Sequence, residues 1–182
     1  PIATWGWLPL LAGVALQEAT ADRGANTTLK WPNDLLAGPE GHKAAGVLAQ
    51  TSGEAVVIGV GLNVSTPADQ LPFPTATSLK QAGAREVDRA DLLVSILTCL
   101  DARLVQWEGA RGDAAACGLA DAYRAVCATI GQHVRVTTMD HRAITGVATG
   151  LDPDGRLIVA SADADGGEAV IGAGDVEHLR PA

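Results

Sequence analysis

The sequence predicts an α+β fold, in which helices pack on a β-sheet and a small β-barrel follows. Up to about residue 128, segments with helical spacing alternate with short β-rich segments. After residue 129 the pattern changes to period two, in short strands separated by Asp and Gly turns. A length of 182 residues suits one sizeable domain and one small one, so we expect domains at residues 1–128 and 129–182.

Three segments have the spacing of helices. Residues 7–21 repeat apolar side chains every three or four positions. Residues 88–108 carry a longer apolar stripe and begin at Asp88, a residue that can cap a helix. The stripe consists of Leu92, Leu93, Ile96, Leu97, Leu100, Leu104 and Trp107. Residues 119–126 predict a third, shorter helix.

Short strands occupy the rest of the first region. We expect them at residues 27–31, 43–50 and 54–60, with a loop after Pro32, a hairpin turn at 38–41 and a loop at 61–71. The second region predicts strands at residues 133–138, 143–151, 156–160 and 168–173. Its Asp-Pro-Asp-Gly sequence at 152–155 is typical of a hairpin turn. Strands this short favour a barrel over a second helical lobe.

Composition excludes several classes of function. The net charge of −8 argues against a general nucleic-acid binder and against binding to an anionic membrane surface. The apolar runs are short and broken, so no membrane span is expected. The three cysteines form no CxxC pair, and we expect reduced, buried thiols in a cytoplasmic protein. The chain begins at Pro1 without Met, so we interpret it as a piece whose N-terminal part is missing.

The segment Lys30–Leu36, with the sequence KWPNDLL, is the first candidate for a site. A strand ends at Pro32, and Asn33 and Asp34 then present an amide and a carboxylate beside an indole. An ordinary Asx turn would explain Asn33 and Asp34 equally well. The whole seven-residue string is more specific than this dipeptide.

The segment Lys43–Leu48, with the sequence KAAGVL, is the second candidate. Lys30, Lys43 and Lys80 are the only lysines among thirteen basic residues, and two of them lie near this segment. A compact ammonium can act as a point charge on a phosphate or carboxylate. A solvated lysine at the edge of a hairpin is the alternative.

The segment Gly59–Val64, with the sequence GVGLNV, is the third candidate. It lacks the third glycine and the following helix of a dinucleotide-binding fingerprint. Its glycines could still let a ligand approach the backbone closely. A β-bulge with a capping Asn is the alternative. The four histidines have no metal-binding spacing, and no metal site is expected.

In order and spacing, these three segments together resemble the biotin protein ligase family. The sequences GVATGLDPDGRLIV and GDVEHLR resemble its C-terminal domain. The resemblance covers nearly the whole chain. It implies a mixed sheet with helices packed on it, as an incomplete class II synthetase-like catalytic core, followed by an SH3-like β-barrel.

The resemblance also implies a reaction. ATP and biotin would form biotinyl-5′-AMP, and biotin would then pass to a lysine of a biotin carboxyl carrier protein. Mg²⁺ would accompany ATP, and a homodimer is possible in this family. A lipoate ligase of the same superfamily and a non-catalytic regulator that binds biotinyl-AMP are the alternatives.

Individual roles follow from the same resemblance. The expected catalytic residues are Lys43, which would neutralise the biotin carboxylate and α-phosphate, and Asp34, which would orient or deprotonate the carrier lysine. The residues expected to bind biotin are Lys43, Gly46, Leu48, Gly59 and Gly61. The residues expected to bind ATP or the adenylate are Lys30, Asn33, Asn63, Asp175 and Arg180.

The chain also departs from the family pattern. The family's glycine- and arginine-rich phosphate loop lies upstream of the matched region, so we expect this chain alone to be inactive and to leave an apolar patch exposed. Ala44 stands where the family usually has a bulky residue. A tryptophan that some members have near residues 76–79 is absent, which puts adenine stacking there in doubt.

Overall fold

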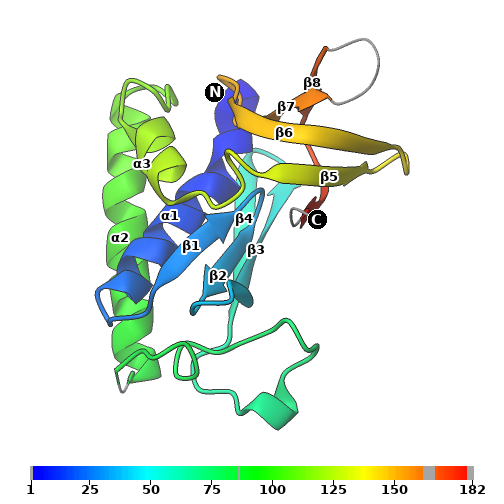
Figure 1. Cartoon of the computed structure of the whole chain (residues 1–182). Coiled ribbons are helices and arrows are strands. Elements are labelled where there is room, and N and C mark those ends of the chain that lie inside the picture. Colours follow the sequence, from blue (N-terminus) through cyan, green and yellow to red (C-terminus); the bar gives the residue numbers. More distant parts are fainter. Residues whose placement is uncertain (1, 86, 162–166, 180–182) are drawn as a thin grey trace.

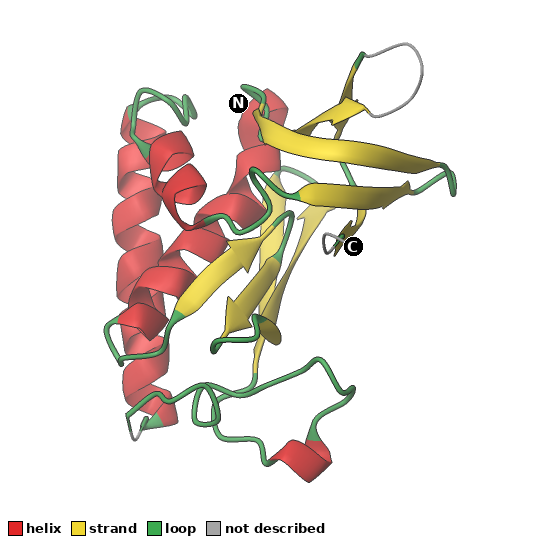
Figure 2. Ribbon diagram, in the orientation of Figure 1, coloured by secondary structure: helices red, strands yellow, loops and turns green. Residues whose placement is uncertain are grey.

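The computed structural model describes residues 2–85, 87–161 and 167–179. It contains a four-stranded sheet, a five-stranded sheet and three α-helices packed beside the first sheet (Figures 1 and 2). The expected α+β fold class is confirmed.

The helices lie close to where the sequence predicts them. They are α1 (Leu8–Ala21), α2 (Arg89–Gly109) and α3 (Leu119–Val126), with short 3₁₀ turns at Ile2–Trp7 and Ala68–Gln70. Helix α1 is buried over most of its surface because it packs against both α2 and the first sheet. Asp88 caps α2 as expected, since its carboxylate accepts hydrogen bonds from the backbone N–H groups of Ala90 and Asp91.

The first sheet has the order β1-β2-β3-β4, and all neighbouring strands are antiparallel. The strands are β1 (Thr27–Lys30), β2 (Asp34–Ala37), β3 (His42–Ser52) and β4 (Ala55–Leu62). Isolated parallel bridges join Leu29 to Cys127 and Lys43 to Ala76. The placement of Asp34 in a loop was wrong, because Asp34 begins β2. The apolar run of β2 is too short to show an alternating pattern.

The second sheet has the order β8-β7-β6-β5-β9. Its strands are β5 (His133–Thr138), β6 (Ala143–Leu151), β7 (Leu157–Ser161), β8 (Glu168–Ile171) and β9 (Gly174–His178). Strand β9 was not predicted, because Val176 is the only large apolar residue in its sequence GDVEH. It pairs along β5, and Val176 is buried there.

One hydrophobic core serves both sheets. Buried side chains from α1, β1, β2 and β3 belong to the same cluster as buried side chains from β5, β6, β7, β8 and β9. Trp7 and Trp31 belong to this cluster and are 2% and 1% exposed. The two sheets are therefore held together by continuous apolar packing.

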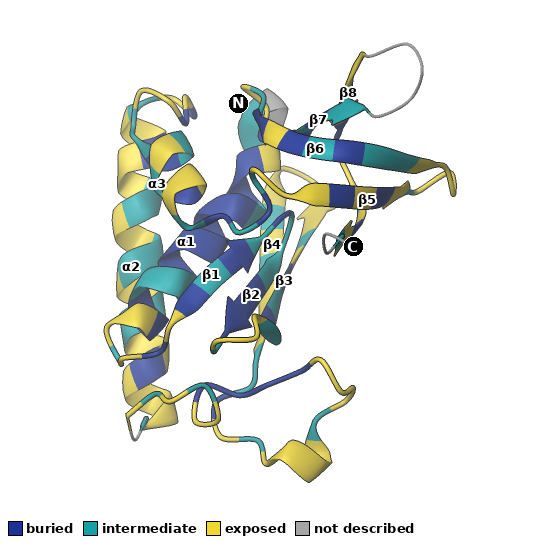
Figure 3. Ribbon diagram, viewed as in Figure 1, coloured by how far each residue is buried: buried dark blue, intermediate teal, exposed yellow. Residues whose placement is uncertain are grey.

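The apolar stripe of α2 is only partly covered. Leu92 and Trp107 are buried, whereas Leu93 and Leu97 are more than half exposed. Figure 3 shows α2 as a mixture of buried, intermediate and exposed positions. Between α2 and the helix-facing side of β4 lies an apolar groove of about 630 Å³. The expected exposed apolar patch is present here. Among the described residues, no helix is long and apolar enough to cross a membrane.

Candidate functional site

Most of the predicted site residues of the first region fall into one area of the first sheet. Lys30, Asp34, Gly46 and Gly61 lie opposite one another in a single row across all four strands. Leu48 and Gly59 form the next pair along β3 and β4 on the same side. Directly opposed residues in neighbouring strands point to the same face of a sheet.

This face, here called the open face, is defined by Lys30, Asp34, Gly46, Leu48, Gly59 and Gly61. Residues of the alternate positions, such as Leu29, Leu35 and Val47, are buried in the core. Leu48 is 69% exposed, and Gly59 and Gly61 are exposed as well. A ligand can therefore reach the open face.

A β-bulge brings Lys43 to the open face. Leu35 lies opposite Ala45, but the next residue, Leu36, lies opposite Lys43, so Ala44 is the extra residue. In an unshifted register Ala44 would lie opposite Leu36, and Lys43 would lie opposite Ala37 and point toward the other face. Ala44 is 1% exposed, so the small side chain at this position fits inside the core.

Lys43 and Asp34 form an ion pair at the centre of the site. The distance from Lys43 Nζ to Asp34 Oδ1 is 2.5 Å. The Asp34 side chain is 16% exposed and the Lys43 side chain 39%, so the carboxylate is the more enclosed partner. Asp34 Oδ1 is buried, and the Lys43 ammonium beside it is its compensating charge.

Beside this ion pair, glycines leave the sheet without side chains that project above the backbone. A Cβ atom at Gly46 would lie 3.4 Å from Lys43 Cε and 3.5 Å from Lys43 Nζ. A Cβ atom at Gly61 would meet nothing within 4 Å, and one at Gly59 only a backbone oxygen at 3.9 Å. The three glycines therefore form a shallow strip, along which a flat or extended ligand could contact the backbone.

The two predicted adenylate-binding asparagines hold the backbone of the site. Asn33 Nδ2 donates to the carbonyl oxygen of Val47 at 2.8 Å, and Val47 N donates to the Asn33 carbonyl. Asn63 Nδ2 donates to the carbonyl oxygen of Thr77 at 3.0 Å. Each amide thus fixes a turn or loop next to the open face.

Lys30 and Asp175 belong to different sheets. Burial and, after it, the positive charge of Lys30 lower the pKa of His178 in β9. Asp175 is exposed on β9 opposite Thr137, and among the described residues no ion pair joins it to Lys43. Arg180 lies outside the described residues.

A buried tyrosine next to the site was not predicted from the sequence. Burial raises the pKa of Tyr123 well above its usual value, and Cys127 and the negative charge of Asp34 raise it further. The Tyr123 side chain is 1% exposed, and Cys127 is the neighbour of its hydroxyl. In the sequence, Tyr123 is one apolar position of a short helix, so no local pattern distinguishes it.

Neither the large groove nor a metal cluster coincides with the open face. Ile58, Val60 and Leu62 line the groove from the opposite side of β4. In the described part of the chain, no three His, Cys, Asp or Glu side chains are arranged to hold a metal ion. The candidate site therefore consists of the Lys43–Asp34 pair and the glycine strip.

Comparison with known proteins identifies relatives of the whole chain. The family model described as "Biotin protein ligase C terminal domain" matches residues 129–179. A biotin–[acetyl-CoA-carboxylase] ligase of Mycobacterium tuberculosis is 41% identical over 184 residues, covering 99% of this chain and 65% of the relative. A bifunctional ligase/repressor BirA of Bacillus subtilis is 32% identical over 168 residues, covering 87% of this chain and 50% of the relative.

Solved structures share the fold. A biotin protein ligase from Aquifex aeolicus has a TM-score of 0.79 at 23% identity, with 94% of this chain and 74% of that chain covered. The same enzyme in complex with biotin and ATP has a TM-score of 0.75, covering 96% of this chain and 71% of that chain. The present chain thus spans about two thirds of one curated relative and half of another, and it belongs to the biotin protein ligase family.

Proposed function

We propose that this chain carries the biotin and adenylate site of an ATP-dependent biotin ligase. The observation that carries the proposal is the Lys43 ammonium, paired with Asp34 at 2.5 Å beside the glycine strip. The similarity to the Mycobacterium tuberculosis ligase over 99% of the chain supports the same assignment. We also propose a catalytic domain at residues 1–128 and a barrel domain at 129–182.

In the first step, a carboxylate oxygen of biotin attacks the α-phosphorus of ATP. An O–P bond forms, the bond to pyrophosphate breaks, and biotinyl-5′-AMP results. Both reacting groups are anions, so a cation between them lowers their repulsion. Lys43 supplies that cation, and its pairing with Asp34 holds it in place before the ligands arrive. Mg²⁺ enters with the phosphates of ATP.

The glycine strip provides the surface for biotin. Gly46, Gly59 and Gly61 leave room above the backbone, and the exposed side chain of Leu48 offers an apolar contact beside them. A small ligand on such a surface buries apolar area while nearby polar groups fix its orientation. The carboxylate end of biotin would then point toward Lys43.

The nucleotide would lie at the edges of the same face. Asn33 and Asn63 hold the two backbone segments that border it. Lys30, in the same row as Asp34, adds a second positive charge. Asp175 and Arg180, from the end of the chain, are the proposed contacts from the barrel.

In the second step, the amine of a carrier-protein lysine attacks the acyl carbonyl of biotinyl-AMP. A C–N bond forms, the C–O bond to AMP breaks, and the amine gives up a proton. The Asp34 carboxylate is the proposed acceptor or orienting group, because it lies on the open face beside Lys43. The proposed acceptor is a lysine on a biotin carboxyl carrier protein.

The test uses a chimaera in which this chain replaces the matching 65% of the Mycobacterium tuberculosis relative. Biotin-dependent exchange of pyrophosphate into ATP, followed by transfer of labelled biotin to a carrier domain, should both be observed. Exchange with lipoate in place of biotin would indicate the lipoate ligase alternative. Binding of biotinyl-AMP without either half-reaction would indicate a regulator instead of an enzyme.

A further inference from the structure

Trp31, in the turn before Asn33 and Asp34, is held from two directions by residues outside the first sheet, one before β5 and one in the turn between β6 and β7. Its indole Nε1 donates to the carbonyl oxygen of Gly155 at 3.1 Å, and its backbone N donates to Thr129 Oγ1 at 3.0 Å. Trp31 is 1% exposed and Thr129 is fully buried. Both acceptors belong to the segment that matches the C-terminal domain of the family.

The Thr129 hydroxyl continues the connection to the last strand. Thr129 Oγ1 lies 3.1 Å from His178 Nε2 in β9. Because Trp31 N–H already donates to this oxygen, the hydroxyl hydrogen is free to point at the histidine nitrogen. A single buried hydroxyl therefore joins the KWPND turn to β9.

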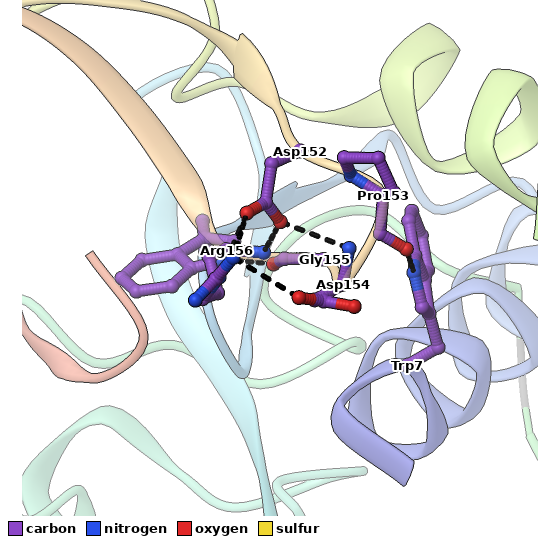
Figure 4. Close-up of polar contacts among 7 residues, drawn as sticks. Trp7, Asp152, Pro153, Asp154, Gly155 and Arg156 are labelled. Atoms are coloured by element: carbon purple, nitrogen blue, oxygen red, sulfur yellow. Dashed lines mark hydrogen bonds and ion pairs between the residues drawn. The ribbon is translucent and has the colours of Figure 1, made fainter. Parts of the chain in front are cut away.

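The turn that accepts the indole is held by hydrogen bonds of its own (Figure 4). Asp152 Oδ1 accepts hydrogen bonds from the backbone N–H groups of Asp154 and Arg156, both at 2.9 Å. Gly155 has a φ of +80°, and a Cβ atom there would lie 3.3 Å from the ring of Trp7. Trp7 Nε1 donates to the carbonyl oxygen of Pro153 at 2.8 Å. Two indoles of the first region thus bind neighbouring carbonyls of one barrel turn.

The two tryptophans lead into different parts of the first region. Trp7 leads into α1, on the helix side of the sheet. Trp31 is followed within three residues by Asn33, which bonds Val47, and by Asp34, which pairs with Lys43. Trp31 therefore lies three residues from Asp34 along the chain, whereas the chain at Trp7 continues into α1.

We propose that Trp31 and Thr129 are positioning residues, through which the barrel fixes the Asn33–Asp34 turn and so the Lys43 ammonium. The catalytic part of this inference rests on the proposed function. The positional part concerns only how firmly the turn is held. The two parts are separable by experiment.

The positional part is tested by amide hydrogen exchange on the 182-residue chain. The reporter is the Val47 amide, which donates to the Asn33 carbonyl at 2.7 Å. Trp31→Phe and Thr129→Val should each speed its exchange about tenfold or more, because local opening of the turn becomes easier. Trp7→Phe is the matched control, since it removes an indole donor to the same barrel turn, and it should leave Val47 protected. Unchanged Val47 exchange in both Trp31→Phe and Thr129→Val would overturn the inference.

The catalytic part is tested in the chimaera by the kcat for biotin-dependent pyrophosphate exchange. Trp31→Phe and Thr129→Val should lower kcat about tenfold or more, since small displacements of reacting groups are costly. Thr129→Ser keeps the hydroxyl, so its kcat should return to the value of the unsubstituted chimaera. The kcat of Trp7→Phe should stay within about twofold of that value. Equal losses in Trp7→Phe and Trp31→Phe at matched stability would reduce Trp31 to a structural role and overturn the assignment. If the unsubstituted chimaera forms no biotinyl-AMP, the proposed function fails, while Val47 exchange still decides whether the barrel holds the turn.

Discussion

Lys43 reaches Asp34 because Ala44 is an extra residue in β3. The bulge turns Lys43 to the open face, where its ammonium lies 2.5 Å from the Asp34 carboxylate. Both residues are expected from the sequence to be catalytic, but no sequence pattern shows that they touch. Because the two side chains are in contact, they act as one functional unit, and a substitution of either one is expected to affect the other.

Lys43→Gln in the chimaera should slow biotinyl-AMP formation far more than it lowers stability, although Asp34 loses its compensating charge. Loss of one donor at developing charge typically costs roughly 3 kcal/mol, or about a hundredfold in rate. The measurement is biotin-dependent pyrophosphate exchange, with the thermal midpoint as the check on folding. Lys80→Gln is the matched control, because Lys80 is exposed and lies outside the open face. A Lys43→Gln rate within twofold of the parent would remove Lys43 from the mechanism.

Asp34→Asn should slow transfer to the carrier more than it slows adenylation. The amide keeps the shape of the carboxylate but cannot accept the proton of the incoming amine. Single-turnover transfer from preformed biotinyl-AMP isolates the second step, and pyrophosphate exchange isolates the first. Equal losses in both steps would mean that Asp34 serves only to hold Lys43.

Gly61→Ala should weaken biotin binding without destabilising the fold. The new methyl group meets no atom within 4 Å, so the chain accommodates it, yet it stands on the strip proposed for biotin. Gly109→Ala, at the end of α2, is an equally unhindered substitution away from the open face. Calorimetric titration of both chimaeras with biotin compares them directly. Unaltered affinity in Gly61→Ala would place biotin elsewhere.

Asp152→Asn should destabilise the protein at neutral pH, and the loss should shrink in acid. Burial opposes ionisation of Asp152, but hydrogen bonds from Arg156 and from the backbone outweigh it, so its pKa is lowered. The ionised form therefore stabilises the folded state above the usual Asp pKa of about 3.9, and this contribution disappears as pH falls through the lower folded value. Urea unfolding of both chains between about pH 7 and pH 2 measures the difference. A pH-independent difference would exclude the charge of Asp152 as its source.

The sequence predicted the elements that depend on local pattern. Helix α2 with its Asp88 cap and the Asp152–Gly155 turn were located by spacing and turn chemistry. Strands β2 and β9 were missed because each is short and has too few alternating apolar residues.

The site could be predicted only as a set of separate motifs. The contact between Lys43 and Asp34 depends on a register shift that no residue type in the sequence indicates. The bonds from Trp31 to Thr129 and Gly155 join positions about a hundred residues apart, and Tyr123 approaches Asp34 only through packing of α3 on β1. Such tertiary relationships have no periodicity to detect.

The 182-residue chain on its own should fold but form no biotinyl-AMP. Its core joins both sheets, so a cooperative thermal transition is expected. Triphosphate binding, by contrast, takes several cations and backbone N–H groups that converge on one point. The cations described on the open face are Lys30 and Lys43, and Lys43 is already paired with Asp34. The net charge of −8 also repels the anionic ATP. Pyrophosphate exchange by the chain should therefore remain at background, while the chimaera is active under identical conditions. Full activity from the chain alone would show that the phosphate site lies within these 182 residues and that the open face is not the whole of it.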